Sequence, residues 1–421
     1  MAKETKSVIT CDLDGKIETF GEGSQALFGY TPDEVIGKQR VSIFSPGLVV
    51  LGPLTKWLKT AREEGAWEGD TVFLDKNGNK IPCHIRITPT FKKEKHIGYC
   101  GVTTRLEGAD VESVTPRISF LTRVFRWFVI TRAPFLTATV VPVLLGGAVT
   151  SLLGYAVDPG LLGLTLLAAS LLHVGTNTAN DYFDYKSGTD DATYDYIVPF
   201  TGGSRSIQMG LISPGGMLTV SLVAFALAGV SAIPLILRAG WPVLLLGTAG
   251  ALSGFFYTAP PLRFCARKGL GELLVALNFG PLMVAGSALV QTGTLQPLAL
   301  LVGVPVGLLT AAILWINEFP DVEGDKATGK DNLVVVMGKA RARYGYVLLV
   351  GGAFTLIVAM AILGVLPLLS LIALPGVYLA VKAIKTMFAH THDRLLKPAN
   401  AGTINLHLIT GLLLCLGVWM G

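Results

Sequence analysis

The chain has 421 residues, of which 51% are apolar and 15% are charged. Soluble proteins carry about 25% charged residues, so the composition excludes an ordinary soluble protein. A formal net charge of +5 is too small to indicate nucleic acid as a partner, and 49 glycines without a period exclude a collagen-like chain. The five scattered cysteines form no CxxC pair, and we predict reduced thiols at Cys11, Cys83, Cys100, Cys265 and Cys415.

Charged residues divide the chain near residue 116. Residues 1–116 hold 15 Lys/Arg and 16 Asp/Glu, a density typical of a soluble domain, whereas the remaining 305 residues hold 19 and 13. The N-terminus has no apolar stretch of the kind found in signal peptides. We therefore expect a small soluble domain attached to an integral membrane domain.

The first part predicts a mixed α/β domain, with turns at Asp14-Gly15 and Asn77-Gly78. We expect strands over 8–13, 16–20, 69–75, 81–91 and 96–105, and helices over 24–30 and 54–64. The phrases "DLDGKIETF", "ALFGYTPDEVIGK", "DKNGNKIPCHIRITPT" and "HIGYCGVTTRLE" resemble a PAS domain, which we assign to residues 1–107.

The PAS resemblance implies a sensor of a ligand, light or redox state, or a module that forms a homodimer. Its ligand stays unknown, because the Asn-Cys-Arg-Phe context of a flavin adduct is absent. His84 and His96 are candidates for haem ligation, but a lone histidine on a strand is more often a surface or core residue. Residues 108–131 join the two parts, and Arg123, Arg126 and Trp127 favour an interfacial helix there.

The second part, residues 132–421, predicts an all-α bundle of nine transmembrane helices. A span needs about 20 mostly apolar residues. Candidates lie at 133–156, 160–180, 216–237, 241–258, 270–291, 297–317, 344–362, 364–382 and 402–420. With the N-terminus inside, 18 of the 19 basic residues fall on the cytoplasmic side, and Arg238 is the exception. We therefore expect a multi-pass protein of a prokaryotic cell membrane, with its C-terminus outside.

Ten of the 13 acids of the membrane part lie in two short clusters, both on the predicted cytoplasmic side. The first cluster comprises Asp181, Asp184, Asp190, Asp191 and Asp195, and the second comprises Glu318, Asp321, Glu323, Asp325 and Asp331. Solvated loops would explain why acids avoid the spans, but not why two clusters share the form Asn-acid-x-x-Asp. Spacings of three and four residues place these carboxylates on one face of a helix end.

Crowded carboxylates repel one another unless cations lie between them. Mg²⁺ is typically bound by one or two carboxylates together with substrate phosphates. We therefore predict a diphosphate site in which about two Mg²⁺ ions are held by Asp181, Asp184, Asp190, Asp321 and Asp325. Lys326, Lys330 and Arg205 stand in the same loops and can neutralise the remaining phosphate charge.

The phrases "NTANDYFDYKSGTD" and "INEFPDVEGDKATGKDNLVVVMG" resemble the two aspartate-rich motifs of the UbiA superfamily of membrane prenyltransferases. The resemblance implies transfer of a polyprenyl group from its diphosphate to an aromatic acceptor. "FTGGSRSIQMGLIS" and "FYTAPPLRF" are most similar to the MenA branch, which uses 1,4-dihydroxy-2-naphthoate in menaquinone synthesis. On this basis Asn177, Asn180 and Asn317 are substrate-binding candidates.

Other residues carry a functional and a structural interpretation side by side. Tyr257 can face the allylic cation or be an interfacial aromatic, and Arg132 can meet an acceptor carboxylate or anchor the chain at the cytoplasmic side. Glu272 is a weak site candidate, and His173 is expected to be a packing histidine.

Alternative functions stay open at this point. Other acceptors of the superfamily are 4-hydroxybenzoate, homogentisate or a lipid glycerol. A transporter would place its charges near the bilayer midplane, and a receptor would need no paired acid clusters.

Overall fold

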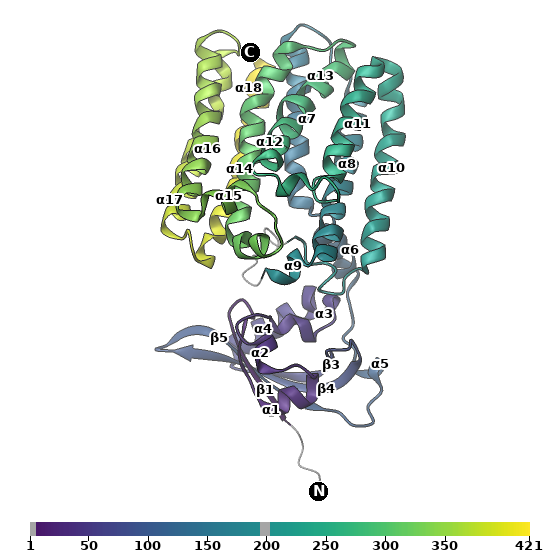
Figure 1. Cartoon of the computed structure of the whole chain (residues 1–421), viewed down its shortest axis with the longest axis vertical. Helices are drawn as coiled ribbons and strands as arrows, with labels where there is room; N and C mark the ends of the chain where they lie inside the picture. The colour runs from purple at the N-terminus through teal and green to yellow at the C-terminus, as the bar shows by residue number, and fades with distance from the viewer. Residues whose placement is uncertain (1–5, 194–202) are drawn as a thin grey trace. The chain divides into compact units, whose positions relative to one another are not determined.

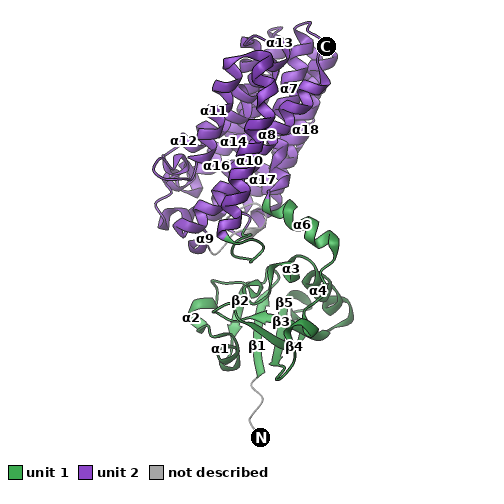
Figure 2. Cartoon of the chain, turned by 90° about the vertical axis from the view of Figure 1, so that its right-hand side faces the viewer, with its two compact units in different colours: residues 1–130, 205–213 green, residues 131–204, 214–421 purple. Residues whose placement is uncertain are grey.

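The computed structural model describes residues 6–193 and 203–421, and these fall into two compact units (Figure 2). Unit 1 comprises residues 1–130 and 205–213, and unit 2 comprises residues 131–204 and 214–421. All five cysteines are free thiols, as expected.

Unit 1 is built on one antiparallel sheet of five strands in the order β2-β1-β5-β4-β3 (Figure 1). Its strands are β1 (Lys6–Asp12), β2 (Ile17–Phe20), β3 (Trp67–Leu74), β4 (Lys80–Lys92) and β5 (Lys95–Arg105). Its helices are α1 (Glu22–Phe28), α2 (Pro32–Val35), η1 (Val41–Phe44), α3 (Gly47–Leu51), α4 (Pro53–Glu64), α5 (Val111–Val114) and α6 (Phe120–Ile130). All five expected strands and both expected helices are present, whereas the short α2, η1 and α3 were not predicted.

Local chemistry explains the turns and the core of this unit. Asp75 accepts hydrogen bonds from the backbone N–H groups of Asn77 at 2.9 Å and Asn79 at 2.8 Å, which closes the turn between β3 and β4. In the core, the rings of Phe28 and Phe44 stack with centroids 4.3 Å apart. Aromatic packing of this kind adds about 0.5–1.5 kcal/mol to the free energy of burial.

Unit 2 is a helical bundle. Its elements are η2 (Ala133–Leu136), α7 (Thr137–Leu152), α8 (Pro159–Ser187), α9 (Thr189–Ala192), α10 (Pro214–Ala239), α11 (Trp241–Phe255), η3 (Phe264–Ala266), α12 (Leu270–Leu277), η4 (Asn278–Leu282), α13 (Met283–Thr292), α14 (Pro297–Ala327), α15 (Leu333–Met337), α16 (Lys339–Ile362), η5 (Leu368–Ala373), α17 (Gly376–Ala389), η6 (Arg394–Leu396) and α18 (Lys397–Met420). The η4 segment is a π-helical turn that joins α12 to α13 within one span.

The expected nine spans are confirmed in part. In the described part of the chain, eight helical segments are long and apolar enough to cross a membrane. The ninth candidate, α11, is an apolar helix of 15 residues, which is short for a bilayer core of about 30 Å. Gly240 before it and Phe256 after it have non-helical backbone angles at the two ends.

Two long helices carry the acid clusters. The predicted second and sixth spans end at residues 180 and 317. In the structure α8, which is 29 residues long, continues to Ser187, and α14, which is 31 residues long, continues to Ala327. Asp158 starts α8 by accepting hydrogen bonds from the N–H groups of Gly160 and Leu161. The main carboxylates of the two clusters therefore lie on the last helical turns rather than in loops.

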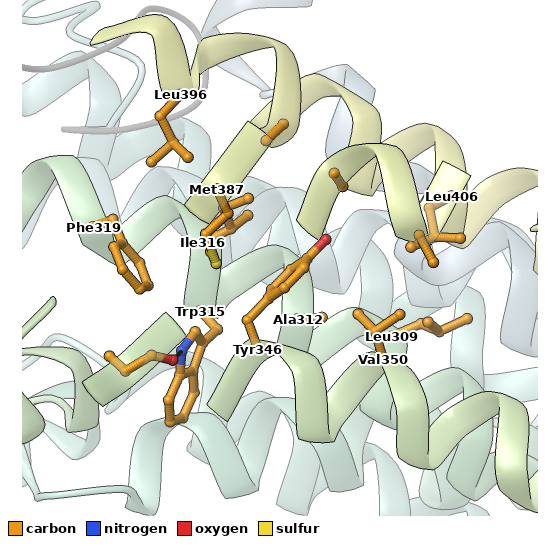
Figure 3. Close-up of a cluster of buried hydrophobic side chains, with 14 of the residues drawn as sticks. Leu309, Ala312, Trp315, Ile316, Phe319, Tyr346, Val350, Met387, Leu396 and Leu406 are labelled. Carbon is orange, nitrogen blue, oxygen red and sulfur yellow. Dashed lines mark hydrogen bonds between the residues drawn. The ribbon is translucent and has the colours of Figure 1, made fainter. Parts of the chain in front are cut away.

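One face of α14 is fixed in a buried hydrophobic cluster (Figure 3). Trp315 donates its indole N–H to the carbonyl oxygen of Ala342 at 2.8 Å, and the Tyr346 hydroxyl pairs with the Thr403 hydroxyl at 2.7 Å. Phe319 is fully buried in the same cluster. These contacts hold α14 against α16 and α18, which leaves its opposite face to line the cavity described next.

Candidate active site

A large cavity lies inside unit 2 among α8, α10, α11, α12, α13 and α14. Its volume is about 780 Å³, and most of the residues that line it are apolar. Ionisable side chains gather at one end, where the last turns of α8 and α14 meet the segment after α14. The cavity thus has a charged end and a larger apolar part. This form is expected for a substrate with a charged head group and an apolar tail.

The first acid cluster is held by a cation and by backbone. The guanidinium of Arg132 contacts the carboxylate of Asp181 and donates a hydrogen bond to Asn180 Oδ1 at 3.0 Å. The N–H of Ser204 donates to Asp181 Oδ1 at 3.1 Å. Gly203 has a φ of +70°, a left-handed backbone conformation that favours glycine, and a Cβ there would lie 2.7 Å from Asp181 Oδ1.

The second acid cluster is organised by two residues just beyond α14. Lys330 Nζ lies 3.5 Å from Asp325 Oδ1 and 3.6 Å from Asp184 Oδ2, so one ammonium group joins the two clusters. Asn332 donates its side-chain N–H to Asp325 Oδ2 at 2.8 Å, while its amide oxygen accepts from the N–H of Val335 and caps α15. The segment after α14 therefore fixes the orientation of Asp325.

Charge and burial together shift the pKa of Lys330, which lies beyond the end of α14. Burial alone would lower the pKa of Lys330, but the carboxylates of Asp184 and Asp325 outweigh it and hold the pKa well above its ordinary value. At neutral pH Lys330 is therefore cationic.

Several buried carboxylate oxygens at this end have no hydrogen-bond partner among the described residues. They are Asp181 Oδ2, Asp184 Oδ1 and Glu318 Oε2. A buried carboxylate oxygen without a partner is costly, so a cation or an additional donor is expected there. Within the described ranges no group of three or more His, Cys, Asp or Glu side chains is close enough together to hold a metal ion without other ligands. A site that offers one or two carboxylate ligands suits Mg²⁺, because this ion takes its other ligands from water and substrate phosphate.

The structure brings ten of the predicted site residues to the wall of one cavity. These are Arg132, Asn177, Asn180, Asp184, Asp190, Tyr257, Asn317, Asp321, Asp325 and Lys330. Asp181 does not line the cavity but contacts Arg132, which does. Lys326 is exposed and Arg205 is buried in the segment grouped with unit 1; neither lines the cavity. Asp195 lies outside the described residues.

Some residues at the site were missed or undervalued by sequence reasoning. Asn332, which the sequence analysis did not single out, donates a hydrogen bond to Asp325. Thr258, which was not considered, accepts a hydrogen bond from Asn180 Nδ2 at 2.6 Å. Glu272 accepts one from the N–H of Leu333 at 2.7 Å and so holds the start of α15. A histidine expected to be simple packing, His173, lines the cavity.

Comparison with known proteins agrees with this geometry. The family model described as "UbiA prenyltransferase family" matches residues 139–408, and the model described as "PAS domain" matches residues 5–105. The fold and the charged cavity define a multi-pass membrane enzyme with a PAS domain in front of it. The chain belongs to the UbiA prenyltransferase family, and it is a prenyltransferase.

Three curated relatives are similar to the chain along much of their length. The 1,4-dihydroxy-2-naphthoate octaprenyltransferase of Bacillus subtilis is 31% identical over 50% of this chain and 65% of the relative. The enzyme of the same name from Escherichia coli is 29% identical over 62% of this chain and 85% of the relative. The 2-carboxy-1,4-naphthoquinone phytyltransferase of Synechocystis is 31% identical over 70% of this chain and 94% of the relative.

Two solved structures share the helical fold. A UbiA homolog from Archaeoglobus fulgidus bound to DMAPP and Mg²⁺ has a TM-score of 0.50 and 16% identity over 69% of this chain and 99% of that one. A UbiA homolog from Aeropyrum pernix in its apo form has a TM-score of 0.50 and 18% identity over 68% of this chain and 97% of that one. At these identities the likeness supports the fold of unit 2.

Proposed function

We propose that this enzyme transfers a polyprenyl group from polyprenyl diphosphate to 1,4-dihydroxy-2-naphthoate in menaquinone biosynthesis. The observation that carries the proposal is the meeting of two acid clusters at one end of an apolar cavity, with Lys330 between Asp184 and Asp325. The names of the three relatives, all of which act on naphthoate or naphthoquinone acceptors, support this acceptor.

The charged end is suited to the diphosphate. Mg²⁺ held at the ends of α8 and α14 would neutralise the phosphate oxygens and stabilise the charge that develops on the leaving group. Asp181 and Asp184 from α8, with Asp321 and Asp325 from α14, supply the oxygen donors for this ion. Lys330 adds a fixed positive charge beside them, so that charge separation at the breaking C–O bond is stabilised by groups already in place.

The apolar remainder of the cavity is suited to the prenyl tail and to the cation-like transition state. Residues such as Leu222, Phe225 and Phe255 line it and exclude water, which would otherwise capture an allylic cation. The ring of Tyr257 lies at the charged end, where a cation–π contact to the same species would lower its energy. The aromatic ring of the acceptor then attacks, and the ring loses CO₂.

Topology and location follow from the distribution of charge. We propose nine crossings of a prokaryotic cell membrane, with α11 as the fourth, the N-terminal PAS domain and both acid clusters in the cytoplasm, and the C-terminus outside. The PAS domain would then regulate transfer or promote a homodimer.

A direct assay with a panel of acceptors tests the acceptor assignment. The purified protein is supplied with Mg²⁺, a long prenyl diphosphate and, in parallel, 1,4-dihydroxy-2-naphthoate, 4-hydroxybenzoate or homogentisate, and products are identified by mass spectrometry. We expect prenylation of the naphthoate with loss of its carboxylate. Prenylation of 4-hydroxybenzoate with its carboxylate retained, together with an inert naphthoate, would reject the assignment.

A further inference from the structure

His173 is a polar side chain in the apolar part of the protein for which the mechanism above has no use. It lies within α8, is buried, and lines the cavity. A titratable side chain inside a membrane span is costly and is usually retained for a function. The contacts of its two ring nitrogens therefore indicate whether His173 only packs against its neighbours or also binds a substrate.

Within the part of the chain that the structure describes, one of the two ring nitrogens of His173 has a hydrogen-bond partner. Nδ1 pairs with the hydroxyl of Thr139 on α7 at 2.8 Å, and the imidazole packs on the ring of Phe279 with centroids 4.7 Å apart. Among the described residues no hydrogen bond reaches Nε2, and this atom is not one of the fully buried atoms that lack a partner. Thr139 and Phe279 fix the ring, and Nε2 is left to an occupant of the cavity.

Helical spacing relates His173 to the charged end. Asn177 and Asn180 follow His173 on α8 by four and seven residues, so the three side chains share one face of the helix. Seven residues at 1.5 Å each separate His173 from Asn180 by about 10 Å along the helix axis. Arg132 binds Asn180, so its guanidinium lies beside one end of this helical stretch and His173 lies at the other end. The length of the stretch is comparable to that of a two-ring aromatic acid.

The chemistry of the two substrates decides which of them meets Nε2. A polyprenyl tail carries no hydrogen-bonding atom, and its diphosphate belongs at the acid clusters. An acceptor whose carboxylate faces Arg132 places its more distant hydroxyl toward His173. In 1,4-dihydroxy-2-naphthoate that group is the 4-hydroxyl, because the 1-hydroxyl is adjacent to the carboxylate.

We propose that His173 binds the aromatic acceptor through a hydrogen bond between Nε2 and the ring hydroxyl that lies furthest from the carboxylate. The inference rests on the proposed function and adds a residue that recognises the acceptor. The Thr139 hydroxyl is a positioning group, since its bond to Nδ1 fixes the orientation of the ring.

Two amide variants separate this role from simple packing. In His173→Gln the side-chain amide reaches the position of Nε2, whereas in His173→Asn it reaches that of Nδ1 and keeps the bond to Thr139. We expect His173→Asn to raise the KM for 1,4-dihydroxy-2-naphthoate about tenfold, and His173→Gln to stay within about threefold of wild type. The KM for prenyl diphosphate should be unchanged in both variants. Equal losses in both, or a loss confined to His173→Gln, would show that packing against Thr139 is what matters.

An acceptor analogue tests the same contact without dependence on the variants' folding. 1-Hydroxy-2-naphthoate lacks the 4-hydroxyl, and we expect it to inhibit the wild-type enzyme with about tenfold weaker affinity than the KM for the substrate implies. The His173→Asn variant should bind this analogue as wild type does. The inference would be overturned if the wild type bound the analogue as tightly as 1,4-dihydroxy-2-naphthoate. It would also be overturned if the His173→Asn variant bound the analogue more weakly than the wild type does. If the wild-type enzyme does not prenylate the naphthoate at all, the proposed function fails instead.

Discussion

Asp184 and Asp325, which belong to different helices and different motifs, share the ammonium group of Lys330 at 3.6 and 3.5 Å. The contact joins the end of α8 to the end of α14. It also places a positive charge between two carboxylates that would otherwise repel each other. The two motifs therefore act as one site, and Lys330 is the residue on which this depends.

Replacement of Lys330 by Met should remove the positive charge and keep the aliphatic stem. We expect kcat/KM to fall about 100-fold or more, because the charge stabilises the leaving diphosphate in the transition state. Lys385→Met is a matched control, since Lys385 is exposed on α17 and does not line the cavity. Initial rates of prenyl transfer for both variants check the prediction. A Lys330→Met enzyme with the rate of the control would remove Lys330 from the mechanism.

Removal of the carboxylates should abolish turnover. Asp181→Ala, Asp184→Ala, Asp321→Ala and Asp325→Ala are each expected to lower the rate about 100-fold or more while the protein still inserts, because each weakens the metal site. Glu323→Gln on the same turns of α14 is the control, because Glu323 is exposed. EDTA should stop the wild-type reaction, and Mg²⁺ should restore it. Full activity in EDTA would contradict the metal hypothesis.

The apolar end of the cavity should limit the length of the prenyl tail. Gly229 on α10 and Gly247 on α11 line the cavity, and an added Cβ at either position would meet nothing within 4 Å. Leucine at these positions should fill the tail's space without strain in the helix. We expect both variants to use geranyl diphosphate as wild type does and to lose long-chain donors about tenfold or more, measured from the product lengths.

Gly351→Leu is the control for tail length. Gly351 on α16 has the same free space around its Cβ position but does not line the cavity. A long-chain defect in this control, or none in the two cavity variants, would show that the tail does not pass Gly229 and Gly247.

The PAS domain should lose a small amount of stability above neutral pH. His84 on β4 bonds Asp70 at 2.6 Å and Glu68 at 2.9 Å through its two ring nitrogens, and these bonds raise the pKa of His84 above its ordinary value. The stabilisation is present in full below the ordinary histidine pKa of about 6.5 and is lost as the pH rises through the folded-state value.

Thermal unfolding of the full chain and of His84→Gln checks this pH dependence. The difference between the two proteins should be about 0.2–1 kcal/mol at pH 6 and vanish by pH 9, because the ion pairs are exposed. A constant difference across this range would mean that the histidine does not titrate as its contacts imply.

Deletion of residues 1–110 should leave prenyl transfer measurable. The acid clusters and the whole cavity lie beyond residue 130, so the truncated protein keeps the proposed catalytic groups. We expect a changed rate, oligomer size or response to a ligand, equivalent to about 1–3 kcal/mol of coupling. Activity assays and size measurements of the two proteins compare them. A truncated protein that inserts and folds but transfers nothing would contradict catalysis by the membrane part alone.

The sequence predicted the elements whose pattern is local. The strands of unit 1 and most spans follow from alternation and apolar length, and the acid clusters follow from carboxylate spacing. The sequence predicted that the two acid clusters form one site. It did not predict that Asp184 and Asp325 share Lys330, because this contact depends on how α8 and α14 pack. Asn332 and Thr258 carry no signal of their own, since a single amide or hydroxyl becomes informative only beside its partner. His173 was predicted to be packing for the same reason: its cavity-facing nitrogen is visible only in three dimensions.

The long helices α8 and α14 also have an energetic consequence. Both helices end at the charged side of the cavity, with Asp184 and Asp325 in their last turns. A helix C-terminus carries a partial negative charge of about half an electron, which disfavours an acidic side chain there by roughly 0.3–1 kcal/mol. The protein thus keeps carboxylates at the two places where the backbone dipoles oppose them most. Divalent cations alone, without any substrate, should therefore raise its melting temperature, because they would offset this unfavourable interaction.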